Sequence, residues 1–374
     1  MRIAVVHSRY RSVNPSGENL VVDAQVEALI AAGHEVHLLT RLSDEVVSSV
    51  DRVRIAARIA FGSDEELASS LEELQPDVIH VHNLFPNFGR TWLQKWGSRT
   101  VLTHHNFRLV CAAASLVRNG RPCFDCVHLG SWMAVVHRCY RDSALLTLPL
   151  AFAARRPLGR EELAFVAHHI FLNAQAQQNY KKMGLSLPSS VLPNFIKSVA
   201  AEAAPHADYW VYAGRLSHSK GHCRLVNQWP SELKLVVAGA GACTECVQPL
   251  AKNIQYVGAI SNEDVVELLR HATGLLVPSQ SSEGFPTVIL EALGVGVPSI
   301  CTSQVAVASE LENRGVCQVI QSEFSTSDLR EACQHLVGMD SRQRCLDLAN
   351  VQYSADSWLA KVEQIYLKVA QCTP

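Results

Sequence analysis

The chain has 374 residues, of which 48% are hydrophobic and 18% are charged. That length suits two domains of about 150–200 residues, each large enough to bury its own core. The formal net charge is −2, so no overall positive field indicates nucleic acid as a partner.

The sequence shows no clear signal for export or membrane insertion. Met1–Val6 runs directly into a strand pattern, without the basic segment, long apolar segment and cleavage site of a signal peptide. The longest apolar run, Ala144–Ala154, contains Pro149 and is shorter than the roughly 20 residues that span a bilayer. We therefore expect a cytoplasmic protein.

Strand and helix patterns alternate along the first half of the chain. In chain order, the predicted elements are the strand Arg2–Val6, the loop Ser8–Glu18, the helix Leu20–Ala32, the strand Glu35–Thr40, the helix Asp64–Leu74, and the strands Asp77–Val81 and Thr100–Thr103. This alternation predicts parallel βαβ units joined by right-handed crossovers.

The alternation pauses at Phe195–Asp208, a stretch of small residues that we interpret as a linker. It resumes with the strands Tyr209–Ala213, Leu233–Ala238, Ile254–Val257, Gly274–Val277 and Pro298–Cys301, and the helices Ser261–His271 and Pro286–Leu293. Two open parallel sheets in tandem predict an α/β protein with binding crevices at the carboxyl ends of the strands.

A last helix is predicted at Asp356–Ala370. It is amphipathic, with Trp358, Val362, Ile365 and Tyr366 on one face. We expect this face to be buried.

The segment Ser281–Pro298 carries the most informative pattern. Glu283 and Glu291 are eight residues apart, and a helix is predicted to begin near Pro286, whose missing N–H costs nothing in a first turn. Gly284 lets a ligand approach the backbone, and the free N–H groups of the helix start attract an anion such as a diphosphate. Glu283 can then reach a sugar hydroxyl and Glu291 ribose hydroxyls; two solvated helix charges are the alternative.

A second pattern, Gly214–Gly221, directly follows a predicted strand. Arg215 offers a rigid fork that matches phosphate oxygens, and Lys220 offers a mobile point charge. Together they can neutralise a departing diphosphate. An ordinary exposed basic loop is the alternative.

These residues, in this order, resemble glycosyltransferase family 4, the retaining enzymes of the GT-B fold. The resemblance rests on Gly214-Arg215 with Lys220-Gly221, on Glu283-Gly284-Phe285, and on Glu291 in an E-x7-E spacing. It implies two Rossmann-like, doubly wound parallel-sheet domains that face each other across a cleft. The implied domains are residues 1–200 with a Cys-rich insertion at about 108–142, residues 207–355, and a helix at 356–374 that returns to the N-terminal domain.

The resemblance also implies roles for single residues of the second half. Arg215 and Lys220 would bind the donor diphosphate, Glu283 would contact the transferred sugar, and Glu291 would bind the ribose. The other donor-binding positions that it implies there are Gly214, Gly284, Phe285 and Pro286.

In the first half, the resemblance places Gly17 near the β-phosphate, Glu18 toward the acceptor and His105 near the reacting carbon. Two positions depart from the usual family pattern. Ser16 precedes Gly17 where a second glycine is usual, and Ser303-Gln304 stands where a glycine-rich turn often follows.

Other histidines allow a structural or a metal-binding interpretation. His80 and His82 flank Val81 on a predicted strand, so their side chains share a face. Such a pair can bind a metal, but no third ligand is evident. Of His104 and His105, we expect one to be structural.

Twelve cysteines are many for a cytoplasmic chain, in which we expect thiols, metal ligands or core residues and no disulfides. Cys111, Cys123, Cys126 and Cys139 form a C-x11-C-x2-C-x12-C pattern. This spacing suits a structural zinc site, and four reduced thiols that pack an insertion are the alternative. A similar Cys-rich stretch occurs in family 4 enzymes that act on polysaccharides and other surface glycans.

The remaining cysteines have simpler interpretations. Those that lie singly in apolar stretches, and are expected in the core, are Cys223, Cys301, Cys317, Cys333 and Cys345. Cys243 and Cys246 have a Cys-x-x-Cys spacing without evident partners, so we expect no metal there.

Arginines flank the apolar run Leu145–Phe152: Arg138, Arg141, Arg155, Arg156 and Arg160. A basic, apolar surface of this kind can dock on anionic lipid and receive a lipid-linked acceptor, which would make the protein peripheral on the inner face of the membrane. A buried helix with ordinary surface arginines is the alternative.

The sequence therefore predicts a retaining, hexosyltransferase-type enzyme with a nucleotide-diphosphate sugar as donor and a saccharide or lipid-linked saccharide as acceptor. We expect no cofactor or divalent metal at the active site. Alternatives of the same fold are a sugar-nucleotide epimerase and a catalytically silent sugar-nucleotide-binding protein. Gly239-Ala240-Gly241 after a strand favours a dinucleotide-binding oxidoreductase only weakly, because the third glycine of that fingerprint is missing.

Overall fold

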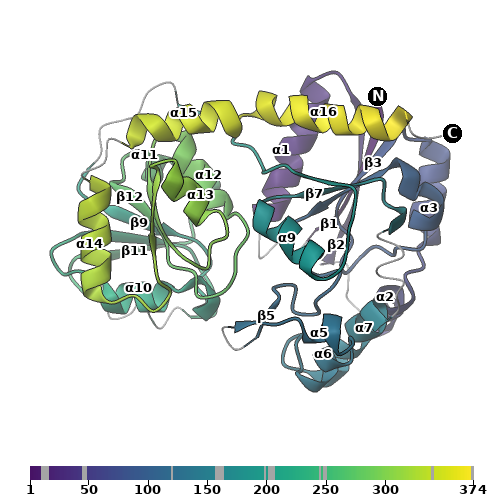
Figure 1. The fold of residues 1–374 in the computed structure, drawn as a ribbon, viewed down its shortest axis with the longest axis horizontal. Helices are drawn as coiled ribbons and strands as arrows, with labels where there is room; N and C mark the ends of the chain where they lie inside the picture. The colour runs from purple at the N-terminus through teal and green to yellow at the C-terminus, as the bar shows by residue number, and fades with distance from the viewer. Residues whose placement is uncertain are drawn as a thin grey trace. The chain divides into compact units, whose positions relative to one another are not determined.

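The computed structural model describes residues 1–9, 17–43, 49–118, 121–155, 164–197, 199–200, 207–243, 246, 251–337 and 341–371. Its contacts divide the chain into two compact units (Figure 1). Unit 1 comprises Met1–Pro193 and Leu359–Pro374, and unit 2 comprises Asn194–Trp358. The first division thus precedes the boundary expected at residues 200–207.

Unit 1 is built on a six-stranded sheet in the order β2-β1-β3-β4-β7-β8, and all neighbouring strands run parallel. The strands are β1 (Arg2–Arg9), β2 (Glu35–Leu42), β3 (Val78–Asn83), β4 (Thr100–His104), β7 (His168–Phe171) and β8 (Ser189–Val191). The direction of winding changes between β1 and β3. Open α/β sheets bind ligands beyond the carboxyl ends of the strands at such a point.

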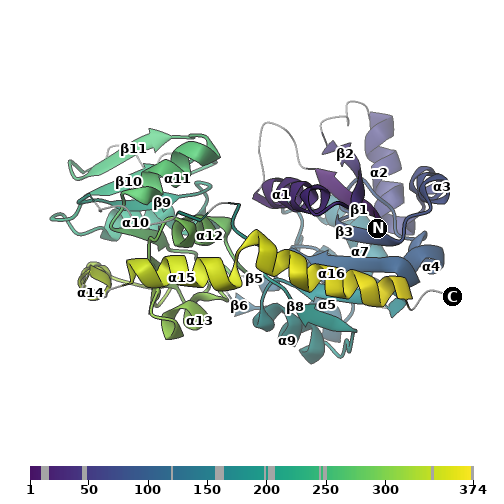
Figure 2. The same cartoon turned by 90° about the horizontal axis from the view of Figure 1, so that it is seen from above.

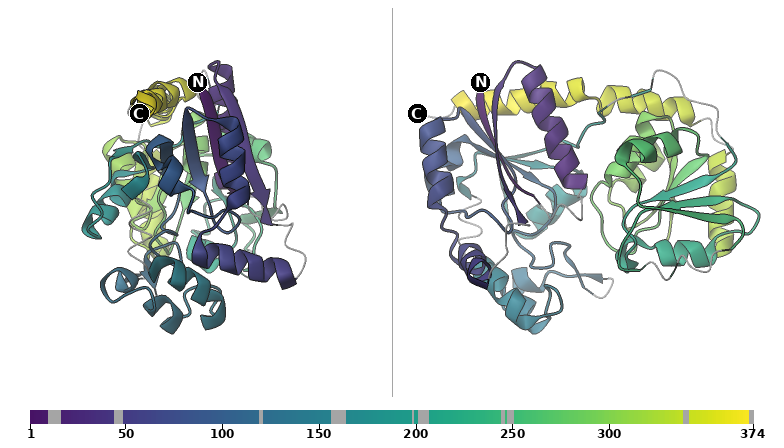
Figure 3. Two further views of the ribbon diagram at one scale, coloured as in Figure 1. Left: turned by 90° about the vertical axis from the view of Figure 1, so that its right-hand side faces the viewer. Right: turned by 180° about the vertical axis from the view of Figure 1, so that it is seen from behind.

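Helices connect these strands, and α1 packs against β1 and β2 (Figure 3, right). The helices before the last one are α1 (Gly17–Ala31), α2 (Ser49–Phe61), α3 (Glu65–Leu74), α4 (Leu93–Trp96), α5 (Asp125–His128), α6 (Met133–Val136), α7 (Ala144–Arg155) and α9 (Ala174–Lys182). A short antiparallel pair, β5 (Val117–Arg118) and β6 (Arg121–Pro122), lies in the Cys-rich segment.

Unit 2 repeats this architecture with the parallel order β11-β10-β9-β12-β13-β14. Its strands are β9 (Trp210–Ala213), β10 (Leu235–Ala238), β11 (Ile254–Gly258), β12 (Gly274–Val277), β13 (Ser299–Thr302) and β14 (Cys317–Ile320). Its helices are α10 (His222–Gln228), α11 (Asn262–Arg270), α12 (Thr287–Gly294), α13 (Ala308–Asn313), α14 (Thr326–Val337) and α15 (Arg342–Gln352).

The alternation of side chains along β9 explains why unit 2 has a core on each face of its sheet. Val211 packs with Leu275 in one cluster, whereas Trp210 and Tyr212 pack with Leu276 in the other. Successive side chains of a strand point to opposite faces, and a parallel sheet is buried on both.

The last helix, α16 (Ala355–Gln371), carries the chain back into unit 1 (Figure 2). Its predicted apolar face is buried: the members Trp358, Val362, Ile365 and Tyr366 are each at most 8% exposed. The Tyr366 hydroxyl lies 2.6 Å from Nδ1 of His80, which attaches the helix to β3. The predicted amphipathic helix is therefore confirmed.

The predicted α/β fold with two parallel sheets is confirmed, but two boundaries that bear on the site were wrong. Helix α1 begins at Gly17 and not at Leu20, so Gly17 and Glu18 belong to its first turn and not to a loop. Pro286 is the N-cap of α12 and not a first-turn residue, because its ψ of 128° is extended. Position 16 lies outside the described residues.

The apolar run for which membrane contact and burial were both open forms α7. One side of it is exposed, with Leu145 77% and Leu146 48% exposed, whereas Leu150 is buried. Phe152 packs edge-on against Phe61 of α2, with ring centroids 5.5 Å apart. Arg156 and Arg160 lie outside the described residues, and membrane contact stays a prediction. Among the helices that the structure describes, none combines the length and apolar character needed to cross a bilayer.

Candidate active site

In unit 2, the loop after β9 is held against the loop after β10 by a close backbone approach. The N–H of Gly214 donates to the carbonyl of Ala238, and that of Leu216 donates to Ala240, over 3.0 and 2.9 Å. A Cβ on Gly239 would lie 1.9 Å from the Gly214 carbonyl oxygen, and the φ of Gly239 is +141°. Only glycine permits this contact. The contact holds the backbone in place at the first residue of the predicted Gly214–Gly221 loop.

A second glycine fixes the far end of that loop. Gly221 has a φ of +75°, and a Cβ there would lie 1.8 Å from the carbonyl oxygen of Pro278. The N–H of Gln280 donates to the carbonyl of Ser219 over 2.8 Å. These contacts bring the loop after β9 against the loop after β12, although about 60 residues separate them in sequence.

The consequence is an ion pair between two of the predicted site residues, Lys220 and Glu283. Their side chains are 32% and 14% exposed, so the pair is partly withdrawn from water. The backbone of Glu283 is fixed on both sides, because its N–H donates to Gln304 over 3.0 Å and its carbonyl accepts from Ala306 over 2.8 Å. Two of the residues predicted to bind the donor thus meet within unit 2.

Arg215 lies on the same loop, next to Gly214. Its side chain is exposed, and its carbonyl accepts a hydrogen bond from the Tyr212 hydroxyl over 2.9 Å. Burial raises the pKa of Tyr212, so this hydroxyl keeps its proton and its bond. The guanidinium group therefore extends from a backbone that is already fixed.

The second glutamate has a different partner. Glu291, on α12, accepts from Nδ2 of Asn262 on α11 over 2.9 Å. Burial raises the pKa of Glu291, and the hydrogen bond from the side-chain amide of Asn262 partly offsets that rise. Gly284 and the buried Phe285 precede the helix, whose N-cap makes no side-chain hydrogen bond. The N–H of Ile289 donates to the Pro286 carbonyl over 3.1 Å. Within the described part of the chain, those of Thr287 and Val288 are left for another acceptor.

In unit 1, buried imidazoles gather where β1, β3 and β4 end. His105 directly follows β4, and its Nε2 lies 3.0 Å from Nδ1 of His82 on β3. His7 of β1 lies 2.9 Å from Oδ1 of Asn19 and 4.0 Å from Glu18. Burial lowers the pKa of His7 to about 4 and that of His105 to about 3. Both rings are therefore neutral at pH 7.

The other histidines of this region have structural partners. His80 uses both ring nitrogens, since Nε2 lies 2.8 Å from the Thr103 hydroxyl and Nδ1 contacts Tyr366. The rings of His80 and His82 lie 4.1 Å apart, as expected for a shared strand face. His104 contacts His169 over 2.9 Å, and which of His104 and His105 is structural stays a prediction.

A pocket of about 760 Å³, including space open to solvent, lies beside this cluster within unit 1. His82, His105 and Asn106 line it, together with the three arginines Arg58, Arg90 and Arg108. None of its described lining residues is acidic. The arginines were not among the residues predicted from sequence, because they come from α2 and two separate loops and share no motif.

The four cysteines of the Cys-rich segment form no disulfide bonds, as predicted. Burial, together with the nearby thiols of Cys111, Cys139 and Cys123, raises the pKa of Cys126 to about 12. They therefore lie near one another. Among the described residues, they are not a set of ligand atoms within 4.8 Å of one another, and zinc binding by this set stays a prediction.

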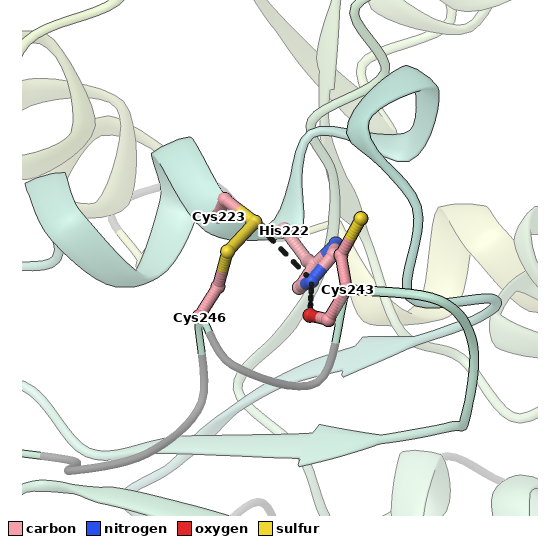
Figure 4. The surroundings of a disulfide bond; sticks show 4 residues. All are labelled: His222, Cys223, Cys243 and Cys246. Carbon is pink, nitrogen blue, oxygen red and sulfur yellow. Dashed lines mark hydrogen bonds between the residues drawn. A yellow bond between two sulfur atoms is a disulfide. The ribbon is translucent and has the colours of Figure 1, made fainter.

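One prediction about cysteine was wrong. Cys223 and Cys246 form a disulfide bond, with their Cα atoms 5.2 Å apart (Figure 4). Cys223 was expected as a core thiol and Cys246 as an unpartnered one. The error arose because the pairing depends on the close packing of the loops after β9 and β10, which no local pattern reveals. The thiols of Cys301, Cys317, Cys333 and Cys345 are free and buried, as expected.

Two family models match consecutive parts of this chain. Glycosyltransferase Family 4 matches residues 15–198, and Glycosyl transferases group 1 matches residues 198–347. The chain belongs to glycosyltransferase family 4. The predicted family is thereby confirmed, and the two parallel sheets are those of its GT-B fold.

A curated relative of this family 4 chain is the "Putative teichuronic acid biosynthesis glycosyltransferase TuaC" of Bacillus subtilis. It is 25% identical over 264 residues, which are 63% of this chain and 56% of that protein. The match thus spans little more than half the length of the relative.

Solved structures share the fold over the whole chain. The sucrose-phosphate synthase of Thermosynechococcus elongatus has a TM-score of 0.69 at 16% identity, with 100% of both chains covered. HepE of Anabaena, solved in complex with UDP-glucose, has a TM-score of 0.61 at 13% identity, with 98% of this chain and 100% of that chain covered. At these identities the likeness establishes the fold alone.

Proposed function

We propose that this family 4 chain is a retaining glycosyltransferase that moves a hexose from a nucleoside-diphosphate sugar to an acceptor hydroxyl. The observation that carries the proposal is the ion pair of Lys220 and Glu283. A cation for the diphosphate and a carboxylate for the sugar thus stand side by side at the carboxyl edge of the unit 2 sheet. The UDP and UDP-glucose complexes of HepE support this class of donor.

Different residues of unit 2 bind different groups of the donor. Arg215 and Lys220 neutralise the diphosphate as the glycosidic bond breaks, and the backbone N–H groups after Gly284 add partial positive charge. Gly214 allows the close approach of the phosphates. Glu283 binds a hydroxyl of the transferred sugar, and Glu291, which already accepts from Asn262, binds ribose hydroxyls.

The residues of unit 1 serve the reacting end. Gly17, at the start of α1, lies where N–H groups attract the β-phosphate, and neutral His105 accepts or donates a hydrogen bond without adding charge. The acceptor hydroxyl attacks the face from which the diphosphate leaves, and the diphosphate takes its proton. Two cations then do the work that a divalent metal does elsewhere, so the active site needs no cofactor.

The acceptor belongs to the pocket beside His105. Its three arginines and its lack of acidic lining residues suit a saccharide that carries phosphate or carboxylate groups, as in a lipid-linked precursor of a polysaccharide. The name of TuaC supports a place in polysaccharide biosynthesis. The exposed apolar side of α7 would then rest on the cytoplasmic membrane surface as a peripheral contact.

The test begins with a thermal-shift screen of nucleoside diphosphates, which identifies the donor base. Turnover with the corresponding sugar donors follows. Arg215→Ala and Lys220→Ala should each lower turnover at least ~10²-fold, the usual effect of removing one preorganised charge. Near-normal turnover in either variant would overturn the assignment.

Product analysis separates the remaining alternatives. A retaining transferase gives a product whose anomeric configuration matches that of the donor. A sugar-nucleotide epimerase would change the sugar without an acceptor, and a silent binding protein would bind the donor and leave it intact.

A further inference from the structure

A second cluster of reactive side chains lies beside the Gly214–Gly221 loop, which we call the donor loop because we propose that it binds the donor diphosphate. Cys223 and His222 open α10, directly after Gly221, and Cys246 follows the loop after β10 (Figure 4). Nothing in the proposed transfer reaction uses these three residues. They nonetheless have the donor atoms of a metal site.

The geometry brings three ligand atoms together. One ring nitrogen of His222 and the sulfurs of Cys223 and Cys246 all lie within 4.8 Å of one another. Nε2 of His222 is 3.4 Å from the Cys223 sulfur and 2.9 Å from the carbonyl oxygen of Cys243.

His222 faces the two sulfurs with its Nε2. With the disulfide present, this nitrogen donates to the Cys243 carbonyl, and among the described residues Nδ1 of the fully buried ring has no hydrogen-bond partner. To bind an ion, Nε2 must give up its proton, and the neutral ring then carries the proton on Nδ1.

We propose that His222, Cys223 and Cys246 form a redox-gated site for a soft divalent cation, with Zn²⁺ as the ion of choice. Reduced, the two thiolates and the imidazole hold the ion. Oxidised, the two sulfurs form the disulfide and release it. Two sulfur ligands and one nitrogen ligand suit zinc, and exclude the hard cations Mg²⁺ and Ca²⁺, which take oxygen ligands.

The fourth position of the ion is left to water. Cys243 is the nearest further thiol in sequence, but its sulfur points away from the disulfide in Figure 4. A site with three protein ligands keeps one coordination position open. Oxidation removes both sulfur ligands and leaves the imidazole alone, so the disulfide form cannot hold the ion.

The chemistry balances in two steps. Two small thiols, such as glutathione, reduce the protein disulfide and leave as one low-molecular-weight disulfide, so two electrons and two protons enter the protein. Zinc binding then releases the two thiol protons. The reverse sequence, with a low-molecular-weight disulfide as oxidant, restores the protein disulfide and frees the ion.

The site lies where its redox state can affect the donor loop. Cys223 lies three residues after Lys220, and the loop leading to Cys246 is hydrogen-bonded to Leu216 through the N–H of Cys243 over 3.2 Å. Either the disulfide or the metal ties these loops together. The reduced, metal-free form leaves the end of the donor loop without that link.

Zinc stoichiometry in the full chain tests the proposal. The Cys123→Ser/Cys126→Ser background removes the other thiol cluster, so that any zinc counted belongs to this site. Metal-free protein is dialysed against Zn²⁺ either with a phosphine reductant or after oxidation with glutathione disulfide, and bound zinc is measured by elemental mass spectrometry. We expect about one zinc per chain when reduced and none when oxidised, as two sulfur ligands require.

Two variants in that background sharpen the result. Cys223→Ser should abolish zinc binding, whereas Cys243→Ser, a thiol of the same loop outside the ligand set, should leave it unchanged. No zinc in the reduced background, or full zinc binding in Cys223→Ser, overturns the proposal. Donor turnover is not read, so failure here leaves the proposed transferase function intact.

A measurement on the unmodified chain covers the case in which the variants do not fold. Reduced protein is alkylated with and without Zn²⁺, and the modified cysteines are mapped by peptide mass spectrometry. Zinc should protect Cys223 and Cys246 and leave Cys243 unaffected. Equal labelling of Cys223 and Cys246 in both samples contradicts the site.

Discussion

The ion pair between Lys220 and Glu283 predicts that two substitutions will change nucleotide binding in opposite directions. Glu283 pairs with the ammonium group that we propose binds the donor diphosphate. Glu283→Gln removes this competitor and one negative charge near the phosphates, so UDP should bind more tightly. Lys220→Met removes the attraction and leaves Glu283 unpaired, so UDP should bind more weakly. Both variants should lose turnover.

The size of the effect follows from Coulomb's law. A phosphate bound to the same ammonium group would lie about 6 Å from the carboxylate, and effective dielectric constants of about 20 to 40 cover a partly buried pair that water still screens. The repulsion is then roughly 1.4–2.8 kcal/mol, or about 10- to 100-fold in Kd. The 14% exposure of Glu283 places it toward the stronger end of this range.

Calorimetric titration with UDP, or with the diphosphate that the screen identifies, measures both affinities. Lys234→Met is the matched control, because Lys234 also pairs with a carboxylate of unit 2, Asp208, but both side chains are well exposed. It should change neither affinity nor turnover. If Glu283→Gln weakens the binding of the nucleotide as Lys220→Met does, the pair is merely structural and the competition argument is refuted.

Further predictions concern unit 1 and the free thiols. Tyr366→Phe should lower the free energy of unfolding by about 1–3 kcal/mol, measured by urea denaturation, because buried His80 loses its partner; an unchanged value would show that the bond contributes nothing. Acidification from pH 7 to pH 5 should destabilise unit 1, because unfolded imidazoles take up protons that folded His7, His80 and His105, with pKa values of about 4, 3 and 3, do not. The upper limit is about 2 kcal/mol for each ring at pH 5. Burial raises the pKa of Glu18 to about 8, which opposes this trend, so Glu18→Gln should steepen the loss; a shallower pH dependence in that variant contradicts the assignment. Cys126→Ser should remove one zinc per chain from reduced protein if the Cys-rich segment binds zinc, and equal zinc in both proteins would leave it a set of packed thiols.

The sequence was most informative where chemistry follows from local pattern. Lys220 and Glu283 could be placed at the carboxyl ends of strands because each follows a short apolar run, and parallel strands present those ends on one edge. Their pairing could not be predicted, because it depends on Gly221 approaching Pro278 within van der Waals distance. The start of α1 was misplaced because Gly17 is a poor helix former, and its place in the first turn is set by the tertiary structure.

Contacts between residues of different strands were harder still to predict from sequence. The two-residue period of a strand correctly put His80 and His82 on one face. That His82 meets His105 depends on the register between β3 and β4, in which Val81 lies opposite Leu102. The disulfide of Cys223 and Cys246 depends in the same way on how two loops pack. The spacing of residues in the sequence indicates neither the His82–His105 contact nor the Cys223–Cys246 disulfide, so both had to come from the structure.

The ion pair of Lys220 and Glu283 also bears on how the proposed donor would bind. A partly buried cation or carboxylate alone is costly, and the pairing of Lys220 with Glu283 leaves neither side chain alone. In the proposed reaction the diphosphate takes over the ammonium group, so Glu283 loses its partner and needs a new one. A sugar hydroxyl is such a partner, and free nucleoside diphosphate does not supply it. The intact donor should therefore recover an interaction that the product cannot, which favours binding of substrate and release of product at the same two residues.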